Sequence, residues 1–256
     1  MTPGQLAIAG LAALAAGVVN ALAGGGTLIS FPVLLALGIP PIAANVTNTV
    51  ALVPGYLSGT WAQRLDLQGQ ARRMWVLLPV AACGGLAGAG LLLITPERAF
   101  TLLIPLLIIT AVAILALGDQ VKRRLAARIS RRPSGHEHLL GPAVGLFFAA
   151  IYGGYFGGGL GIIVIAVLGF VLVDSLRRLN ALKQSVSLVV NAGAALIFAC
   201  SGRVWWGTAL VMLVCALLGG YIGGHTAGRL SPAVLQRVVL IIGVVVAVAY
   251  TVKTLR

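Results

Sequence analysis

Acidic side chains are scarce in this chain of 256 residues. The five Asp and Glu residues are Asp66, Glu97, Asp119, Glu137 and Asp174, and none lies in the middle of an apolar stretch. Transporters that are driven by protons often carry a carboxylate inside the membrane, and an intramembrane protease needs a cluster of His and carboxylate groups or a Ser beside a base. The sequence therefore predicts no enzyme and no catalytic residues.

Cysteine and histidine are also rare. Cys83, Cys200 and Cys215 lie in apolar stretches without CxxC spacing, so they are expected to be small buried hydrophobic residues and not a disulfide framework or a metal site. The three His residues show no spacing typical of metal ligands. The sequence also has no GxxxxGK[ST] motif, which excludes ATP as the energy source. We therefore expect no metal and no cofactor.

Charged residues make up only 9% of the chain, whereas hydrophobic residues make up 59% and the mean hydropathy is +1.05. Average soluble domains contain roughly 25% charged residues. A soluble fold cannot hide this much apolar surface from water, so the solvent must be lipid. The composition predicts an all-α, polytopic helix bundle in the cell membrane.

The formal net charge of +13 comes from Lys and Arg residues between the apolar stretches. This placement is typical of cytoplasmic loops, which follow the positive-inside rule, and it argues against nucleic acid as a partner. The most basic loop spans residues 119–138 and is predicted to be a cytoplasmic linker, for which binding to anionic membrane lipid is an alternative role.

Ten apolar stretches divide the chain, and eight of them are predicted to be long enough to cross a bilayer. They lie at about 4–22, 27–38, 43–62, 74–94, 98–118, 140–155, 160–173, 181–201, 205–227 and 233–253. The exceptions are 27–38 and 160–173, because a helix of about 13 residues reaches only roughly 20 Å. We expect these two to be broken or half helices.

Both short stretches follow a glycine triplet, and the two triplets are 133 residues apart. Asn45 and Asn180 repeat at almost the same offset, as do the motifs that begin at Gly84 and Gly219. This pattern predicts an internal duplication with a first repeat at 1–118, the linker at 119–138 and a second repeat at 139–256.

The direction of the repeats depends on whether the short helices cross the membrane. If they do, the halves are inverted and 14 of the 18 Lys and Arg residues lie on the cytoplasmic side. If the second short helix does not cross, only 12 do. The positive-inside rule therefore favours inverted repeats over parallel ones.

The glycine triplets and nearby polar residues form the predicted binding site. A helix that begins inside the membrane offers N–H donors and the positive end of its dipole, which suits an anion. Polar side chains inside spans tend to face a cavity. The predicted substrate-binding residues are Asn20, Gly24, Gly25, Gly26, Thr27, Asn48, Thr49, Tyr155, Gly157, Gly158, Gly159, Lys183, Gln184 and Asn191.

Several of these residues have a purely structural alternative. Glycines are enriched where membrane helices touch, so the triplets could serve close packing, and for the motifs at Gly84 and Gly219 packing is the preferred interpretation. Lys183 could extend its ammonium group to the membrane surface instead of binding an anion.

Two sets of motifs resemble the sulfite exporter TauE/SafE family of membrane permeases. The first set is Gly17-Val18-Val19-Asn20-Ala21-Leu22-Ala23-Gly24-Gly25-Gly26-Thr27 with Phe31-Pro32-Val33-Leu34, and the second set is Gly157-Gly158-Gly159 with Asn180-Ala181-Leu182-Lys183. The resemblance covers nearly the whole chain. It implies transport of sulfite, sulfonates or related sulfur anions.

Together these observations predict a transporter that moves a small sulfur-containing anion by alternating access at a site between the two repeats. The alternative is a membrane subunit that scaffolds an enzyme complex without transporting anything. The sequence leaves the oligomeric state, the direction of transport and the coupling ion open.

Overall fold

The computed structural model describes residues 1–129, 139–172 and 174–226, and all regular structure in this part is helical. The helices are α1 (Pro3–Leu22), α2 (Thr27–Ala36), α3 (Pro41–Ala62), a short 3₁₀ helix η1 (Arg64–Leu67), α4 (Ala71–Ile94), α5 (Glu97–Ile129), α6 (Leu140–Tyr155), α7 (Leu160–Val171), α8 (Leu176–Ala199) and α9 (Trp206–Thr226). The apolar stretch predicted at 233–253 lies outside the described residues.

Local sequence signals set several helix ends. Thr2 and Gln5 form a capping box at the start of α1, with Pro3 in the first turn. Ser175 caps α8 by accepting a hydrogen bond from the backbone of Arg178. The last turn of α1 ends where Gly24 takes a φ of 78°, a left-handed conformation that glycine adopts without strain. The chain can therefore turn inside the bundle.

Five described helices are long and apolar enough to cross a membrane, namely α1, α4, α5, α8 and α9. Helix α3 has 22 residues, but its first half carries Asn45, Thr47, Asn48 and Thr49. The two predicted short helices are present as α2 with 10 residues and α7 with 12. Helix α6 has 16 residues and reaches only about 24 Å, so counting it among the long spans was wrong.

The predicted start of the basic linker at residue 119 was also wrong. Helix α5 continues through Ile129 and is 33 residues long, because no glycine or proline interrupts the segment after Gly118. Residues 130–138 of the predicted linker lie outside the described residues.

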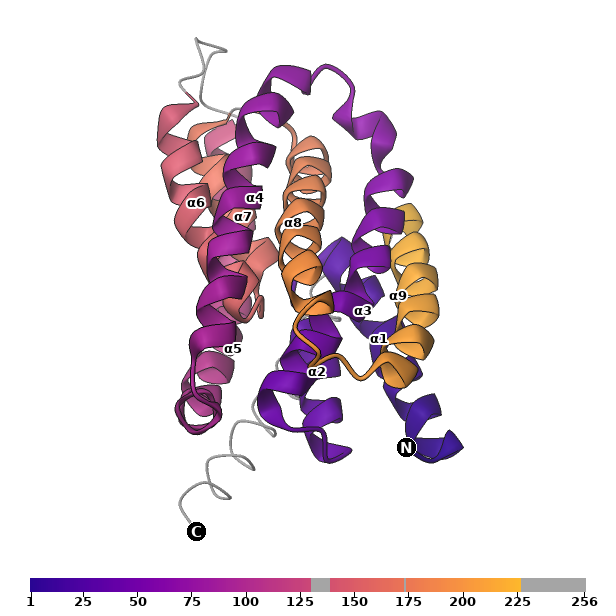
Figure 1. Ribbon diagram of the computed structural model, residues 1–256. Helices are drawn as coiled ribbons and strands as arrows, with labels where there is room; N and C mark the ends of the chain where they lie inside the picture. The colour runs from indigo at the N-terminus through magenta and orange to yellow at the C-terminus, as the bar shows by residue number, and fades with distance from the viewer. Residues whose placement is uncertain (130–138, 173, 227–256) are drawn as a thin grey trace.

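The helices form two groups with α8 between them (Figure 1). Helix α9 packs against α1 and α3, while α4 packs against α6 and α8. The fourth helix of each predicted half therefore lies against the first helix of the other half. Glycines make both contacts close: a Cβ at Gly88 would lie 2.0 Å from the Ile151 carbonyl oxygen, and one at Gly219 would lie 2.1 Å from that of Leu14. The packing interpretation of these glycine motifs is confirmed.

Contacts between loops define the two ends of the bundle. At one end, the ion pair of Asp66 with Arg177 joins η1 to the first turn of α8, and the ion pair of Arg73 with Asp174 joins the start of α4 to the α7–α8 connection. At the other end, Glu97 accepts a hydrogen bond from the backbone of Ile42 at 3.0 Å. Figure 1 shows the N-terminus at this second end. The inverted arrangement of the two repeats remains a prediction.

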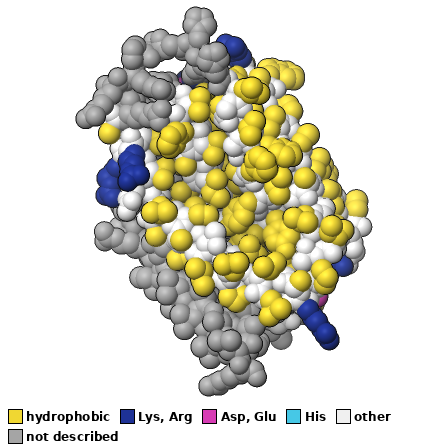
Figure 2. Space-filling view, turned by 90° about the vertical axis from the view of Figure 1, so that its left-hand side faces the viewer, with side chains coloured by type: hydrophobic (Ala, Val, Ile, Leu, Met, Phe, Trp, Pro, Cys, Tyr) yellow, Lys and Arg dark blue, Asp and Glu magenta, His cyan; other side chains and the backbone are white. Residues whose placement is uncertain are grey.

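The side of the molecule formed by α4 to α7 presents a broad hydrophobic surface (Figure 2). Large apolar side chains that are exposed on these helices include Trp75, Leu102, Leu106, Ile109, Phe148 and Phe170. Lys and Arg side chains lie near the edges of this view. An uncharged face of this extent suits contact with lipid acyl chains, so the chain is a multi-pass membrane protein.

Candidate functional site

The two helix breaks begin with the same local geometry, although in the second break Gly159 also has a left-handed φ, of 75°. In the first break, the N–H groups of Ala23 and Gly24 both donate to the carbonyl of Val19. In the second break, the N–H groups of Phe156 and Gly157 both donate to the carbonyl of Tyr152. The φ angles of Gly24 and Gly157 are 78° and 77°. Helices α1 and α6 are thus each terminated by a glycine in the left-handed conformation, and a short helix, α2 or α7, follows.

The breaks meet in the interior of the protein. A Cβ at Gly24 would lie 2.5 Å from the Cα of Gly161, which is in the first turn of α7. All six glycines of the triplets are buried. The two triplet regions therefore come together through direct backbone contact, and an open space between them remains a prediction.

Most of the amide groups at the starts of α2 and α7 are satisfied by tight local turns. Leu28 and Ile29 donate to Gly25 and Gly26, and the N–H of Gly26 donates to Asn20 Oδ1 at 2.7 Å. The amides without an acceptor in the described part of the chain are those of Gly25, Thr27, Gly158, Gly159 and Gly161. These five N–H groups belong to the two breaks and to the first turns of α2 and α7. They are the donors that an anion could use.

Lys183 on α8 lies at this same contact. Its side chain is only 1% exposed, and a Cβ at Gly161 would lie 3.3 Å from Lys183 Cδ. The ammonium group donates to the carbonyl oxygen of Asn20 at 3.1 Å, where the negative end of the α1 dipole stabilises a cation. The alternative in which Lys183 extends to the membrane surface is wrong, because its Nζ is held in the interior.

Asn45 and Asn180 stabilise the ends of the broken helices reciprocally. Asn180 on α8 donates to the carbonyl of Ala21 at the end of α1, at 3.2 Å. Asn45 on α3 donates to the carbonyl of Tyr155 at the end of α6, at 2.8 Å. Each asparagine thus satisfies a carbonyl that the helix break leaves without an intrahelical donor. Sequence reasoning noticed this pair as a repeated residue at the start of two polar segments but did not include it among the substrate-binding residues.

The tyrosines of the second break have different roles. Tyr152 donates from its hydroxyl to the carbonyl of Gly158 at 2.6 Å and so holds the glycine triplet in place. The predicted site residue Tyr155 directs its hydroxyl to Thr95, at 3.4 Å, and its ring packs against Phe100. Its side chain therefore faces α4 and α5. The spacing Tyr152-Gly-Gly-Tyr155 did not distinguish the two.

A polar seam runs along the interface of α3 and α8. Asn48, Gln184 and Ser187 have buried side-chain atoms without a hydrogen-bond partner in the described part of the chain, including both amide atoms of Gln184. Asn191 donates to the Ser187 carbonyl and forms a hydrogen bond with Tyr56. Leaving a buried polar group unpaired costs about 1–3 kcal/mol. Ligands or water molecules are therefore expected along this seam.

The predicted site residues thus fall into neighbouring groups. Asn20, Lys183 and the first triplet meet at the contact with Gly161, whereas Gln184 and Asn191 belong to the seam. Thr27 and Thr49 are each 6% exposed. Ser187 and Tyr56 were missed, although Ser187 lies at the helical i+3 position from Gln184 and could have been found from that spacing.

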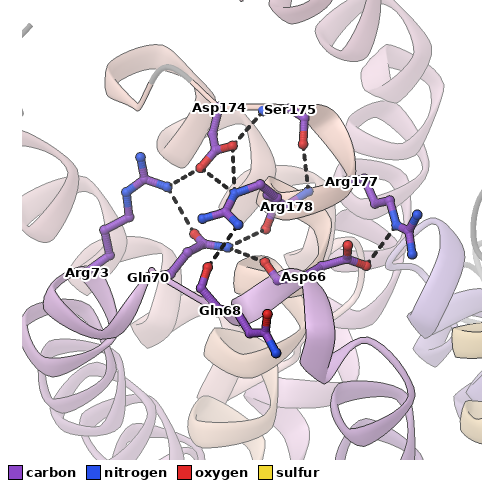
Figure 3. A network of polar contacts seen from close by, with 8 residues as sticks. All are labelled: Asp66, Gln68, Gln70, Arg73, Asp174, Ser175, Arg177 and Arg178. Carbon is purple, nitrogen blue, oxygen red and sulfur yellow. Dashed lines mark hydrogen bonds and ion pairs between the residues drawn. The ribbon is translucent and has the colours of Figure 1, made fainter. Parts of the chain in front are cut away.

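A network of charged and polar residues lies at one end of the bundle (Figure 3). Asp174 pairs with Arg73 on α4 and, at 2.9 Å, with Arg178 on α8. Arg178 also donates to the carbonyl of Gln68 at 2.9 Å. Burial raises the pKa of Asp174, but the hydrogen bonds from Arg73 and Arg178 outweigh it and hold that pKa below its usual range. This network joins the α3–α4 connection to the α7–α8 connection.

The chain is similar to bacterial proteins that are named probable membrane transporter proteins. The chain is 24% identical to the probable membrane transporter protein YfcA of Escherichia coli K12 over 259 residues, which covers 96% of this chain and 90% of the relative. It is 27% identical to the probable membrane transporter protein ORF9 of Sinorhizobium, covering 95% and 91%, and 27% identical to one of Haemophilus influenzae, covering 92% and 90%. No solved structure matches the chain.

The match to a family is equally extensive. Residues 9–250 match the family described as sulfite exporter TauE/SafE, so the match includes both helix breaks and the charged end. The resemblance noted in the glycine motifs is confirmed over nearly the full length. The chain belongs to the sulfite exporter TauE/SafE family of membrane proteins.

Proposed function

We propose that this protein transports a small sulfur-containing anion, such as sulfite or an organosulfonate, across the cell membrane by alternating access. The observation that carries the proposal is the meeting of two helix breaks beside a buried cation. Gly24 touches Gly161, and the Lys183 side chain packs at the same point. Discontinuous helices with this kind of end commonly hold the substrate near the middle of transporters.

The chemistry of this region favours a small anion. The N–H groups of Gly25, Thr27, Gly158, Gly159 and Gly161 can replace part of the anion's hydration shell. The positive charge of Lys183 is partly offset by the Asn20 carbonyl, so it attracts an anion without binding it irreversibly. The oxygen atoms of a sulfite or sulfonate group are acceptors, which suits this set of donors.

The proposed inverted repeats supply the motion. The α3–α8 interface runs between the two halves, and each half is held at its helix break by an asparagine of the other. Rocking of one half against the other would open the site to one side at a time. The charged network around Asp174 would then be formed when its end of the protein is closed and broken when that end opens.

Transport by purified protein in proteoliposomes tests the proposal. Vesicles that are loaded with an unlabelled anion are diluted into the same anion in radiolabelled form. Sulfite, a taurine-type sulfonate, phosphate and acetate are compared, and counterflow is recorded against protein-free vesicles. We expect exchange of at least one sulfur anion and little exchange of acetate. A protein that only scaffolds other subunits would give no flux above protein-free vesicles for any anion, and that result would reject transport.

A further inference from the structure

The two helix breaks begin with the same hydrogen-bonded turn but differ in a residue that faces them. Lys183 follows Asn180 by three positions on α8, and Asn48 follows Asn45 by three positions on α3. Residues three apart lie on the same face of a helix. Asn180 and Asn45 each donate to a carbonyl near the end of the opposite broken helix, so Asn48 lies on the side of α3 that faces the second break, as Lys183 lies on the side of α8 that faces the first.

At the first break, a cation already occupies this position. The ammonium of Lys183 binds the carbonyl oxygen of Asn20, which comes one residue after the doubly hydrogen-bonded carbonyl of Val19. At the second break, the doubly bonded carbonyl belongs to Tyr152, and the next carbonyls toward the end of α6 are those of Gly153 and Gly154. The end of a helix carries partial negative charge, so both positions suit a positive group.

At the second break, the facing side chains provide acceptors instead of a cation. The Oδ1 atoms of Asn45 and Asn48 are buried and have no hydrogen-bond partner in the described part of the chain. The two side chains are 0% and 1% exposed. The orientation of Asn45 is fixed, because its Nδ2 donates to the Tyr155 carbonyl. Two unpaired amide oxygens therefore lie next to a helix end that favours positive charge.

We propose that a sodium ion binds at the second break and takes the place that the Lys183 ammonium has at the first. Its protein ligands are the Oδ1 atoms of Asn45 and Asn48 and a carbonyl oxygen in the last turn of α6, that of Gly153 or Gly154. Neutral amide and carbonyl oxygens at the end of a discontinuous helix are a common sodium-binding arrangement in transporters. The ion is the coupling ion of the proposed transport, and this role rests on the proposed function.

Sodium-dependent stability measures this binding without any sulfur anion and without flux. Thermal unfolding of the detergent-solubilised protein is followed in NaCl, KCl and choline chloride at equal ionic strength. We expect a rise in the unfolding midpoint that saturates with sodium and is much smaller with potassium. No sodium-dependent rise in the wild-type protein overturns the proposal, whatever the outcome of the transport experiment.

The exchange variants Asn48→Lys and Lys183→Asn locate the ion. Asn48→Lys places a tethered ammonium at the second break, so the sodium-dependent shift should disappear. Lys183→Asn removes the ammonium group from the first break. The sodium-dependent rise in the unfolding midpoint should therefore persist and should depend more steeply on the sodium concentration. Retention of the full shift in Asn48→Lys overturns the assignment of the site.

Two further measurements test the sodium site if Asn48→Lys does not fold or if a different cation binds there. If Asn48→Lys does not fold, Asn48→Ala removes one ligand and should raise the half-saturating sodium concentration at least tenfold, and an unchanged value rejects the site. A substrate that carries its own ammonium group could occupy the same position. An amino sulfonate is therefore compared with an alkyl sulfonate in choline chloride, and a shift with the amino sulfonate but none with sodium overturns the sodium assignment.

Discussion

Gly24 and Gly161 touch through their backbones at the point where the two broken helices meet. A Cβ at Gly161 would lie 2.6 Å from the Cα of Gly24, and one at Gly24 would lie 2.5 Å from the Cα of Gly161. Real Cβ atoms do not approach other atoms this closely, so the contact requires glycine on both sides. Its closeness makes the relative position of α1 and α7 sensitive to the smallest possible side chain.

The substitution Gly161→Ala is therefore expected to destabilise the protein by about 1–3 kcal/mol, since a methyl group forced into a packed interior displaces backbone. The matched control is Gly90→Ala in α4, because a Cβ at Gly90 meets nothing within 4 Å. The control should unfold at the wild-type temperature or slightly above it. Thermal unfolding in detergent compares the two, and equal midpoints would show that the contact is less tight than described.

Lys183 is expected to be needed for transport because of its charge. Lys183→Met keeps most of the apolar side chain and removes the ammonium that binds the Asn20 carbonyl. We expect the initial rate of anion uptake to fall at least about tenfold, which corresponds to roughly 1.4 kcal/mol. Arg203→Met, at an exposed position between α8 and α9, is the control for loss of one positive charge. Unchanged uptake in folded Lys183→Met would assign Lys183 a capping role alone.

Asp174 should contribute more to stability than Asp66, although each forms an ion pair at the same end of the protein. Asp174 accepts hydrogen bonds from Arg73 and Arg178, whereas the partner of Asp66 is the Arg177 side chain, which is 74% exposed. We expect Asp174→Asn to cost about 1.5–3 kcal/mol and Asp66→Asn less than about 1 kcal/mol. Thermal unfolding of both variants at neutral pH provides the comparison.

The pH dependence gives an independent check on Asp174. Its pKa is lower in the folded protein than the ordinary value of 3.8, so its contribution is complete above that value and is lost as the pH falls through the folded pKa. The difference in unfolding free energy between the wild-type protein and Asp174→Asn should stay constant down to a pH of about 4 and should decrease below that pH. A difference that already changes near neutral pH would contradict the depressed pKa.

The direction of the chain in the membrane is tested by labelling single cysteines. Cys83, Cys200 and Cys215 are first replaced by Ala or Ser. A cysteine at Ser175, at the charged end, should react with a membrane-impermeant maleimide only from the cytoplasmic side. One at Arg203, at the opposite end, should react only from outside. Labelling at Ser175 only from outside would exclude the inverted arrangement.

The sequence was sufficient to predict the elements that depend on local chemistry. The glycine triplets predicted both breaks, since a left-handed φ at Gly24 and Gly157 is a property of those residues themselves. The alternation of apolar and basic segments predicted a membrane helix bundle. Helix ends without such signals were less predictable, and α5 therefore runs past the expected boundary to Ile129.

Interactions between distant segments could not be predicted in the same way. Nothing in the local sequence indicates that Asp174 pairs with Arg73, because the two residues are 101 positions apart and meet only through the packing of α4 against α8. The roles of Tyr152 and Tyr155 depend on which way each ring points from α6. The unpaired oxygen of Asn48 depends on its surroundings and not on its identity.

The reciprocal capping of the broken helices has a consequence for biosynthesis. Asn180, which satisfies the end of α1 at Ala21, is 159 residues later in the chain. At about 5–20 residues per second, a ribosome needs roughly 8–30 s to make that stretch. Until the second half is inserted, the first half therefore lies in the membrane without the hydrogen bond from Asn180 to the end of α1. Splitting the gene between the halves would yield two polypeptides that are each unfinished alone and become stable only when both are made in the same membrane.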